Sequence, residues 1–193
     1  MIFEKSIYED QLFEKTDSSG LNIDSTEFEE CIFKLCDFSK IKITSCKFIQ
    51  CTFIDCDLSM TDLTETQLSD VKFKNCKLMG IHFFRCNKFL FDVGFDTCIL
   101  DYSSFAEMKI PKTSFSNSNL KGVDFNRTFL EQANFDDADL NEAIFSGTNL
   151  KGADFSTARN YIIDPRDNFL KNAKFSRNGL WGLLTNIGIK IID

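Results

Sequence analysis

Large apolar side chains recur at every fifth position along most of this chain. From Phe3 to Phe83, and again from Leu90 to Phe155, 30 of the 31 positions in this series hold a large apolar or aromatic residue. Neither an amphipathic helix, with a period near 3.6, nor an alternating strand, with a period of 2, has this spacing. The pattern therefore indicates a short structural repeat that governs the whole fold.

Each repeat reads small, polar, large apolar, polar, polar. The small residue lies two positions before the large one, and it is often cysteine in the first half and alanine, serine or threonine in the second. Residues two apart point to the same side of an extended strand, so the small and the large residue face inward together. The two remaining polar residues turn the chain. Four such units close a square coil, and coils stack at the roughly 4.8 Å spacing of paired strands.

A four-sided coil predicts that residues 20 positions apart stack in one column. Between Phe105 and Phe155 the large residue almost alternates phenylalanine with leucine or isoleucine. We therefore expect phenylalanine ladders on two opposite sides of the coil, and right-handed winding, as in almost all parallel crossovers. One ladder would contain Phe95, Phe115, Phe135 and Phe155, and the facing one Phe105, Phe125 and Phe145.

Three segments carry a family resemblance: Ala133-Asn134-Phe135, Ala138-Asp139-Leu140 and Ala153-Asp154-Phe155. They resemble the pentapeptide-repeat family, whose members contain A-(D/N)-L-x-x in tandem, and the resemblance covers nearly the whole chain. It implies an all-β fold, a right-handed quadrilateral parallel β-helix over residues 1–175, with a C-terminal helix and strand over 176–193. The N-terminal half departs from the common form because cysteine or threonine often replaces alanine.

Two stretches interrupt the repeat. Phe83 and Phe95 are 12 residues apart, so two extra residues enter the region 84–94. These residues form either a bulge that divides the solenoid or a projecting loop that contacts a partner, and Gly94 would supply an unusual backbone angle there. An irregular stretch at 159–168 contains an Asp-Pro pair, which is typical of a turn.

Beyond the repeat the period becomes helical. Apolar spacing predicts a short helix with Ser176 as its cap and Gly188 at its end, followed by a brief strand at 189–192. The helix either covers the open end of the solenoid or forms a two-fold dimer contact, which the resemblance favours because several family members dimerise through this end. The candidate interface residues are Leu180, Trp181, Leu183, Leu184 and Ile187.

Composition argues against catalysis. The only histidine, His82, falls at an outward position, and no G-x-S-x-G, glycine-rich phosphate loop or H-E-x-x-H motif is present. Eight cysteines occupy small inward positions, where Cys36, Cys56 and Cys76 would form one column oriented alike, which suits neither a disulfide nor zinc. We therefore expect no enzymatic activity, no cofactor and no metal.

The charge of the chain limits the kinds of partner that it can bind. The formal net charge is −7, and residues 91–154 contain 11 acids against five bases. Such a surface repels phosphates, so direct nucleic-acid binding is not expected. No apolar run approaches the roughly 20 residues of a membrane helix, and the start lacks the pattern of a secretion signal. We expect a cytoplasmic protein.

The resemblance implies a function. Some members of this family imitate the shape and charge of duplex DNA, bind bacterial type II topoisomerases and protect them from drugs or toxins. For this chain it suggests binding to DNA gyrase or topoisomerase IV and protection from quinolone-like inhibitors. The alternative is a structural or scaffolding solenoid with another protein partner. The candidate acidic surface contains Glu131, Asp136, Asp137, Asp139 and Glu142.

Overall fold

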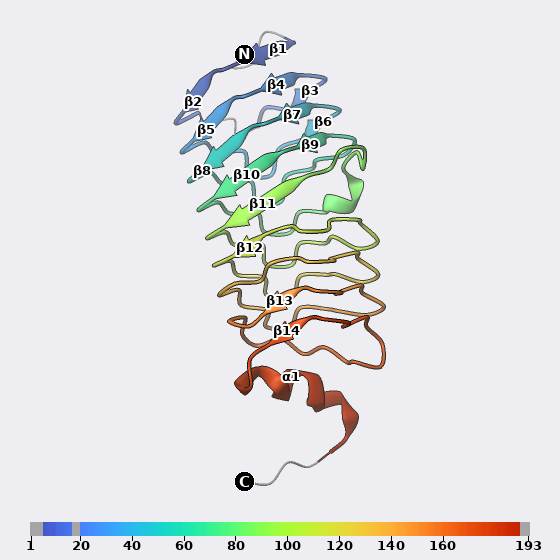
Figure 1. Cartoon of the computed structure of the whole chain (residues 1–193). Coiled ribbons are helices and arrows are strands. Elements are labelled where there is room, and N and C mark those ends of the chain that lie inside the picture. The colour runs from blue at the N-terminus through green and yellow to red at the C-terminus, as the bar shows by residue number, and fades with distance from the viewer. Residues whose placement is uncertain (1–5, 17–19, 190–193) are drawn as a thin grey trace.

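A computed structural model describes residues 6–16 and 20–189. The chain winds as a right-handed, four-sided parallel β-helix of about eight coils, with one short helix at its C-terminal end (Figure 1). The fold expected from the five-residue period is therefore confirmed. We number the sides in chain order, so that Tyr8 lies on the first side and Phe13 on the second, while the third and fourth sides contain Phe38 and Ile43.

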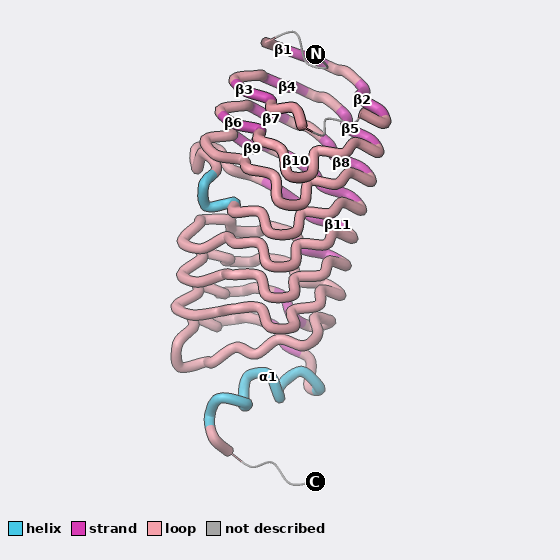
Figure 2. The backbone as a smooth tube through the Cα atoms, turned by 180° about the vertical axis from the view of Figure 1, so that it is seen from behind, coloured by secondary structure: helices cyan, strands magenta, loops and turns pink. Residues whose placement is uncertain are grey.

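Strands of two to four residues form the sides, and every pairing between them is parallel. The first side contains β1 (Ile7–Glu9), β4 (Glu27–Glu29), β7 (Lys47–Ile49) and β9 (Gln67–Ser69), and the fourth contains β3 (Ile23–Asp24) and β6 (Ile43–Thr44). The second side contains β2 (Leu12–Glu14), β5 (Ile32–Lys34), β8 (Thr52–Ile54), β10 (Val71–Lys74), β11 (Val93–Asp96), β12 (Phe115–Ser116), β13 (Asp154–Phe155) and β14 (Lys174–Phe175). In the later coils, single bridges such as that between Asn119 and Asp139 replace most strands (Figure 2).

A continuous phenylalanine ladder runs along the second side. The expected stack of Phe95, Phe115, Phe135 and Phe155 is confirmed, with ring centroids 5.3, 5.2 and 4.5 Å apart along it. The ladder also extends beyond both ends of the expected segment and crosses the insertion, where Phe73 stacks on Phe95 at 5.4 Å. Its members are Phe13, Phe33, Phe53, Phe73, Phe95, Phe115, Phe135, Phe155 and Phe175.

A second aromatic ladder changes side along the rod. In the later coils Phe105, Phe125 and Phe145 stack on the fourth side, as expected, and meet the second side edge to face. In the first coils the second aromatic column instead lies on the adjacent first side, where Tyr8, Phe28 and Phe48 stack. Aliphatic residues fill most of the remaining inward positions, with Phe38 on the third side as an aromatic exception.

Cysteine thiols fill the small inward positions of the first half. The expected column of Cys36, Cys56 and Cys76 is present: the Cys36 N–H donates to Cys56 Sγ and the Cys56 N–H donates to Cys76 Sγ, each at 3.4 Å. All eight cysteines are reduced and buried. Six of the thiols donate to carbonyl groups of the coil before, for example Cys51 Sγ to the Phe28 carbonyl at 3.3 Å.

The insertion adds its two residues between Asn87 and Val93. Asn87 pairs with Gln67, 20 positions earlier, whereas Val93 pairs with Val71, 22 positions earlier. A 3-10 helix, η1 (Phe83–Arg85), precedes the bulge. The expectation that Leu90 resumes the inward series is wrong, because Leu90 is 59% exposed in a left-handed conformation (φ 54°), while Phe91 packs against the core instead.

Gly94 also differs from expectation. It lies inside β11 with ordinary extended backbone and has open space where a Cβ would stand, so the unusual backbone angle of the bulge belongs to Leu90. The regular interior resumes in the next repeat, where Cys98 fills the small inward position and Leu100 the large one, and both are buried.

A broken helical segment follows the last coil. It consists of η2 (Asn178–Leu180), α1 (Trp181–Leu184) and η3 (Thr185–Ile187). The expected cap is present, since Ser176 Oγ accepts the Gly179 N–H at 3.0 Å, and Gly188 ends the segment with a φ of 75°. The expected strand at 189–192 lies outside the described residues except for Ile189, which is not in a strand.

Candidate protein-binding surfaces

The five acidic candidates lie around one coil and not along the axis of the rod. Glu131 is at the corner between the first and second sides, where Lys151 lies 3.6 Å away and Asn149 Nδ2 donates to it at 2.8 Å. The second side separates it from Asp136 and Asp137 at the next corner. Because of this separation, Glu131 does not share one surface with the other four acids.

The other four acids share the third side and its two corners. Asp136 accepts a hydrogen bond from Thr157 Oγ1 at 2.7 Å, and Asp139 accepts one from Asn160 Nδ2 at 2.8 Å. Glu142 occupies the corner between the third and fourth sides. Together with Tyr102, which has the larger effect, it raises the pKa of Lys121.

Neighbouring coils interrupt these acids along the axis. The third-side bridges of Asp139 lead to Asn119 in one direction and to Arg159 in the other. Sequence reasoning missed the acids that do stack: Glu9 pairs with Glu29 in register, and both lie with Asp10 and Glu30 around a shallow hollow of about 290 Å³. Their 20-residue spacing was the available signal.

The insertion forms an exposed apolar projection. Phe89 is 69% exposed, and Phe84 and Leu90 are also exposed. Beside them a hollow of about 580 Å³ is lined by Phe84, Arg85 and Lys88 together with Glu65 of the preceding coil. The projection therefore combines large apolar side chains with a partly basic rim.

The C-terminal helical segment covers the open end of the rod. Leu183 packs against the core, and Leu184 is half-buried. The Ile163 N–H donates to the Gly182 carbonyl at 2.9 Å, which ties α1 to the last coil. The remaining candidates, Leu180, Trp181 and Ile187, are exposed, so the helical segment covers the end of the solenoid and still leaves apolar side chains accessible.

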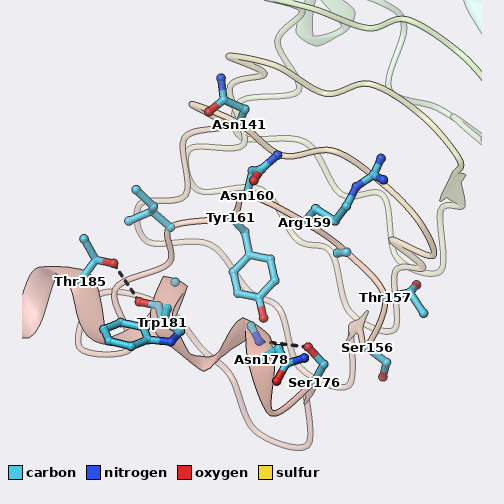
Figure 3. A pocket seen from close by; sticks show the side chains of 14 residues that line it. Asn141, Ser156, Thr157, Arg159, Asn160, Tyr161, Ser176, Asn178, Trp181 and Thr185 are labelled. Carbon is cyan, nitrogen blue, oxygen red and sulfur yellow. Dashed lines mark hydrogen bonds between the residues drawn. The ribbon is translucent and has the colours of Figure 1, made fainter. Parts of the chain in front are cut away.

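A cleft of about 560 Å³ lies between this segment and the last coil (Figure 3). Tyr161 stands in its centre with its ring buried against Phe155 and Phe175. Its hydroxyl is buried beside Gly179 and has no hydrogen-bond partner among the described residues. Trp181 and Thr185 line the opposite part of the cleft.

The described residues contain no cluster of three or more metal-ligating side chains. Burial raises the pKa of the Cys46 thiol to about 11 and that of Cys51 to about 12, which keeps both protonated and unreactive. His82 is exposed, as expected. Within the described part of the chain, no helix is both long and apolar enough to cross a membrane.

Comparison with known proteins agrees with this geometry. The family model described as pentapeptide repeat region matches residues 26–89 and 88–159. A trypsin-treated variant of QnrB1, a plasmid-mediated fluoroquinolone resistance protein, has 20% identity and a TM-score of 0.54, covering 96% of this chain and 90% of its own. HetL from Nostoc sp. strain PCC 7120, involved in regulation of heterocyst differentiation, has 17% identity and a TM-score of 0.42, covering 90% of each chain. No curated protein sequence matches significantly.

Proposed function

This chain belongs to the pentapeptide-repeat family, and we propose that it is a non-catalytic binding protein that protects DNA gyrase or topoisomerase IV from quinolone-like inhibitors. Fold membership alone does not assign a role, so the proposal depends on the surface. The fold likeness to a fluoroquinolone resistance protein extends over 96% of the chain and supports the drug class, whereas the partner class comes from the family resemblance.

The acidic third side is the observation that carries the proposal. Asp136, Asp137, Asp139 and Glu142 are all exposed on this side and its corners, on a rod whose backbone is fixed by coil-to-coil hydrogen bonds. A rigid negative surface complements a protein surface that binds DNA phosphates, and such complementarity guides association. The two-fold contact through Leu180, Trp181 and Ile187 would double the length of the rod.

A supercoiling assay with gyrase and a quinolone tests this function. The native protein should restore supercoiling in the presence of the drug. The double variant Asp137→Lys/Glu142→Lys should require about tenfold more protein, because reversed charges oppose association. Both positions are left-handed corner residues, with φ of 51° and 61°.

A matched control is available at the other end of the rod. Asp10 and Glu30 are also acidic left-handed corner residues, with φ of 47° and 52°. The double variant Asp10→Lys/Glu30→Lys makes the same charge change and should protect as the native protein does. Absence of protection by the native protein would remove the proposal.

The exposed projection at the insertion favours a second candidate, a scaffolding solenoid with another protein partner. Phe89 and Leu90 are both exposed and contribute nothing to the buried ladders. Deleting them restores the 20-residue register. A partner isolated from the native host with the intact protein, and lost with this deletion, would support scaffolding where supercoiling protection is absent.

A further inference from the structure

One surface of the rod combines lysines with exposed phenylalanines. It is the first side of the C-terminal half, and we call it the lysine–phenylalanine face. Its defining residues are Lys109, Lys112, Phe129, Lys151, Phe169 and Lys171. It lies opposite the acidic third side, because the first and third sides face each other across the coil.

Two parallel columns build this face. Backbone bridges connect Lys109 to Phe129, Phe129 to Asn149, and Asn149 to Phe169, so these four residues follow one another along the centre of the side. The corner beside them contains Lys112, Lys151 and Lys171, whose coils are joined by hydrogen bonds from Lys112 N to Glu131 O and from Gly152 N to Lys171 O.

The central column exposes two aromatic rings. Phe129 is 44% exposed and Phe169 is 70% exposed. At the matching outward position of the second side the same coils hold Asn134, Asp154 and Lys174, all polar. Outward phenylalanines contribute nothing to the interior of the rod, and exposed aromatic groups among charged residues are typical of protein-binding surfaces.

The charge of the face is positive in a chain with a net charge of −7. Its four lysines face one carboxylate, Glu131, which pairs with Lys151. At the corner with the fourth side Arg127 pairs with Glu107, and Asp167 adds one further carboxylate, so the face keeps a positive balance. Lys109 Nζ lies 5.7 Å from the centre of the Phe129 ring, within the range of a cation–π contact.

We propose that the lysine–phenylalanine face binds an acidic protein segment that carries apolar side chains. The backbone of the face is already hydrogen-bonded between coils, so the segment is held by side chains and not by strand addition. Apolar groups of the segment cover the two rings, and its carboxylates meet the lysines. The face is opposite the acidic side, so both sides can be occupied together.

A protein segment fits better than a nucleic acid. Lys109 already occupies one face of the Phe129 ring, which leaves less of it for base stacking. The net negative charge of the chain repels a long polyanion, whereas a short segment with few carboxylates meets mainly the local lysines.

Fluorescence anisotropy with a labelled synthetic peptide of alternating glutamate and leucine tests the inference. Native protein should bind it, and added salt should weaken binding. The exposed double variants Phe129→Asn/Phe169→Asn and Lys109→Glu/Lys171→Glu should each lower the affinity by about tenfold or more, as expected for central aromatic and charged contacts. Tyr102→Asn and Lys121→Glu, on the opposite part of the rod, should leave the affinity unchanged.

Three outcomes would overturn the inference: no peptide binding by native protein, equal binding by the face variants, or tighter binding of oligothymidylate or of phosphatidylserine vesicles. Circular dichroism of each variant checks that the fold is intact. The supercoiling assay should be unaffected by the face variants, so failure of this inference and failure of gyrase protection are separately visible.

Discussion

Corner residues illustrate how single positions adapt to the coil. The last residue of nearly every repeat adopts a left-handed conformation, and most of these residues are not glycine, for example Leu35 (φ 55°) and Tyr102 (φ 59°). This conformation costs roughly 1–2 kcal/mol for a residue with a side chain. Regular coil-to-coil hydrogen bonding and core burial compensate, so almost any residue is accepted there.

Gly182 in the C-terminal segment has a stricter role. A Cβ at Gly182 would lie 2.1 Å from the Tyr161 carbonyl oxygen and 2.7 Å from its ring. Gly182→Ala should therefore undock α1 and lower stability by about 1–3 kcal/mol, as overpacking does. Thermal unfolding measures the loss, and fluorescence of Trp181, the only tryptophan, reports the undocking.

Gly94→Ala is the control for this substitution. Gly94 has ordinary backbone angles and no atom within 4 Å of an added Cβ. The variant should unfold at or slightly above the native temperature, since alanine restricts the unfolded chain more than glycine does. An undisturbed Trp181 signal in Gly182→Ala would contradict the docking role of Tyr161.

The ionisation of Asp154 makes the stability of the fold depend on pH. Hydrogen bonds from Ser156 and Lys174 lower its pKa from 3.8 to about 2 in the folded protein. The folded pKa is below the unfolded one, so this carboxylate stabilises the fold above about pH 4, and the contribution is lost as the pH falls toward 2. Asp154→Asn should show a smaller loss of stability over that interval in urea unfolding.

Removing one partner of Asp154 gives an independent check. Lys174 Nζ lies 2.9 Å from the carboxylate, whereas the Ser156 N–H donates to the other oxygen at 3.0 Å. Lys174→Met should raise the pKa of Asp154 part of the way toward 3.8, and carbon NMR titration measures this change. A pKa that does not move would show that Lys174 is not a cause.

At the scale of elements, the second-side ladder is the main support of the rod. Phe115 is fully buried and stacks on both Phe95 and Phe135. Phe115→Ala should lower the free energy of unfolding by about 3–5 kcal/mol. Phe175→Ala, at the half-buried end of the same ladder, should cost about half as much, because that site can relax. Urea unfolding of both variants compares them.

Near-equal losses would contradict this picture. Equal losses of unfolding free energy would mean that the position of a ring in the ladder does not matter. In a solenoid each repeat is stabilised by its neighbours, so a ring with neighbours on both sides should matter more than one at the end. Phe145, only slightly exposed on the fourth side and close to the C-terminal cap, offers an intermediate position for the same measurement.

The five-residue period was sufficient to predict the fold because each unit contributes one large inward residue, and only a four-sided coil superposes residues 20 apart. It placed Phe115 and Phe135 in one ladder correctly. It failed at Leu90, since the period gives the number of extra residues but not which side chain turns inward. There Phe91 reaches the core and Leu90 takes the left-handed corner.

The candidate surfaces were less predictable. Sequence counts gave the acidic surplus of residues 91–154 but not its division among corners, so Glu131 was grouped with acids that lie beyond the second side. The stacked acids Glu9 and Glu29 required the register as well as the charge. Exposure of Phe129 and Phe169 likewise follows from their outward position in the coil, which the count of phenylalanines conceals.

At the scale of the whole molecule, the C-terminal half of the rod carries opposite charges on two opposite sides. The third side carries Asp136, Asp139 and Glu142, and the opposite first side carries Lys109 and Lys171. A rod with two unlike sides can hold two partners of opposite charge, or present one side while the other is covered. This arrangement suits a binding protein, and the two assays described above address each side separately.

The C-terminal end decides whether this rod exists alone or as a pair. Trp181 is 56% exposed at the rim of the C-terminal cleft, and Leu180 and Ile187 of the same helical segment are also exposed. We expect a two-fold dimer through this face, because burying these side chains against a second copy removes apolar surface from water. Light scattering of the native protein should give twice 22.1 kDa, whereas Trp181→Glu should give the monomer mass.

Leu12→Glu provides the control for the dimer, since Leu12 is an exposed apolar residue of β2, at the opposite end of the rod from the C-terminal segment. It should leave the native mass unchanged. A monomer mass for the native protein at micromolar concentration would rule out the dimer and leave α1 as a cap alone. Because Leu183 packs against the core whereas Trp181 is more than half exposed, Trp181→Glu should separate the copies without uncovering the last coil, and the separated copies should keep the native fold.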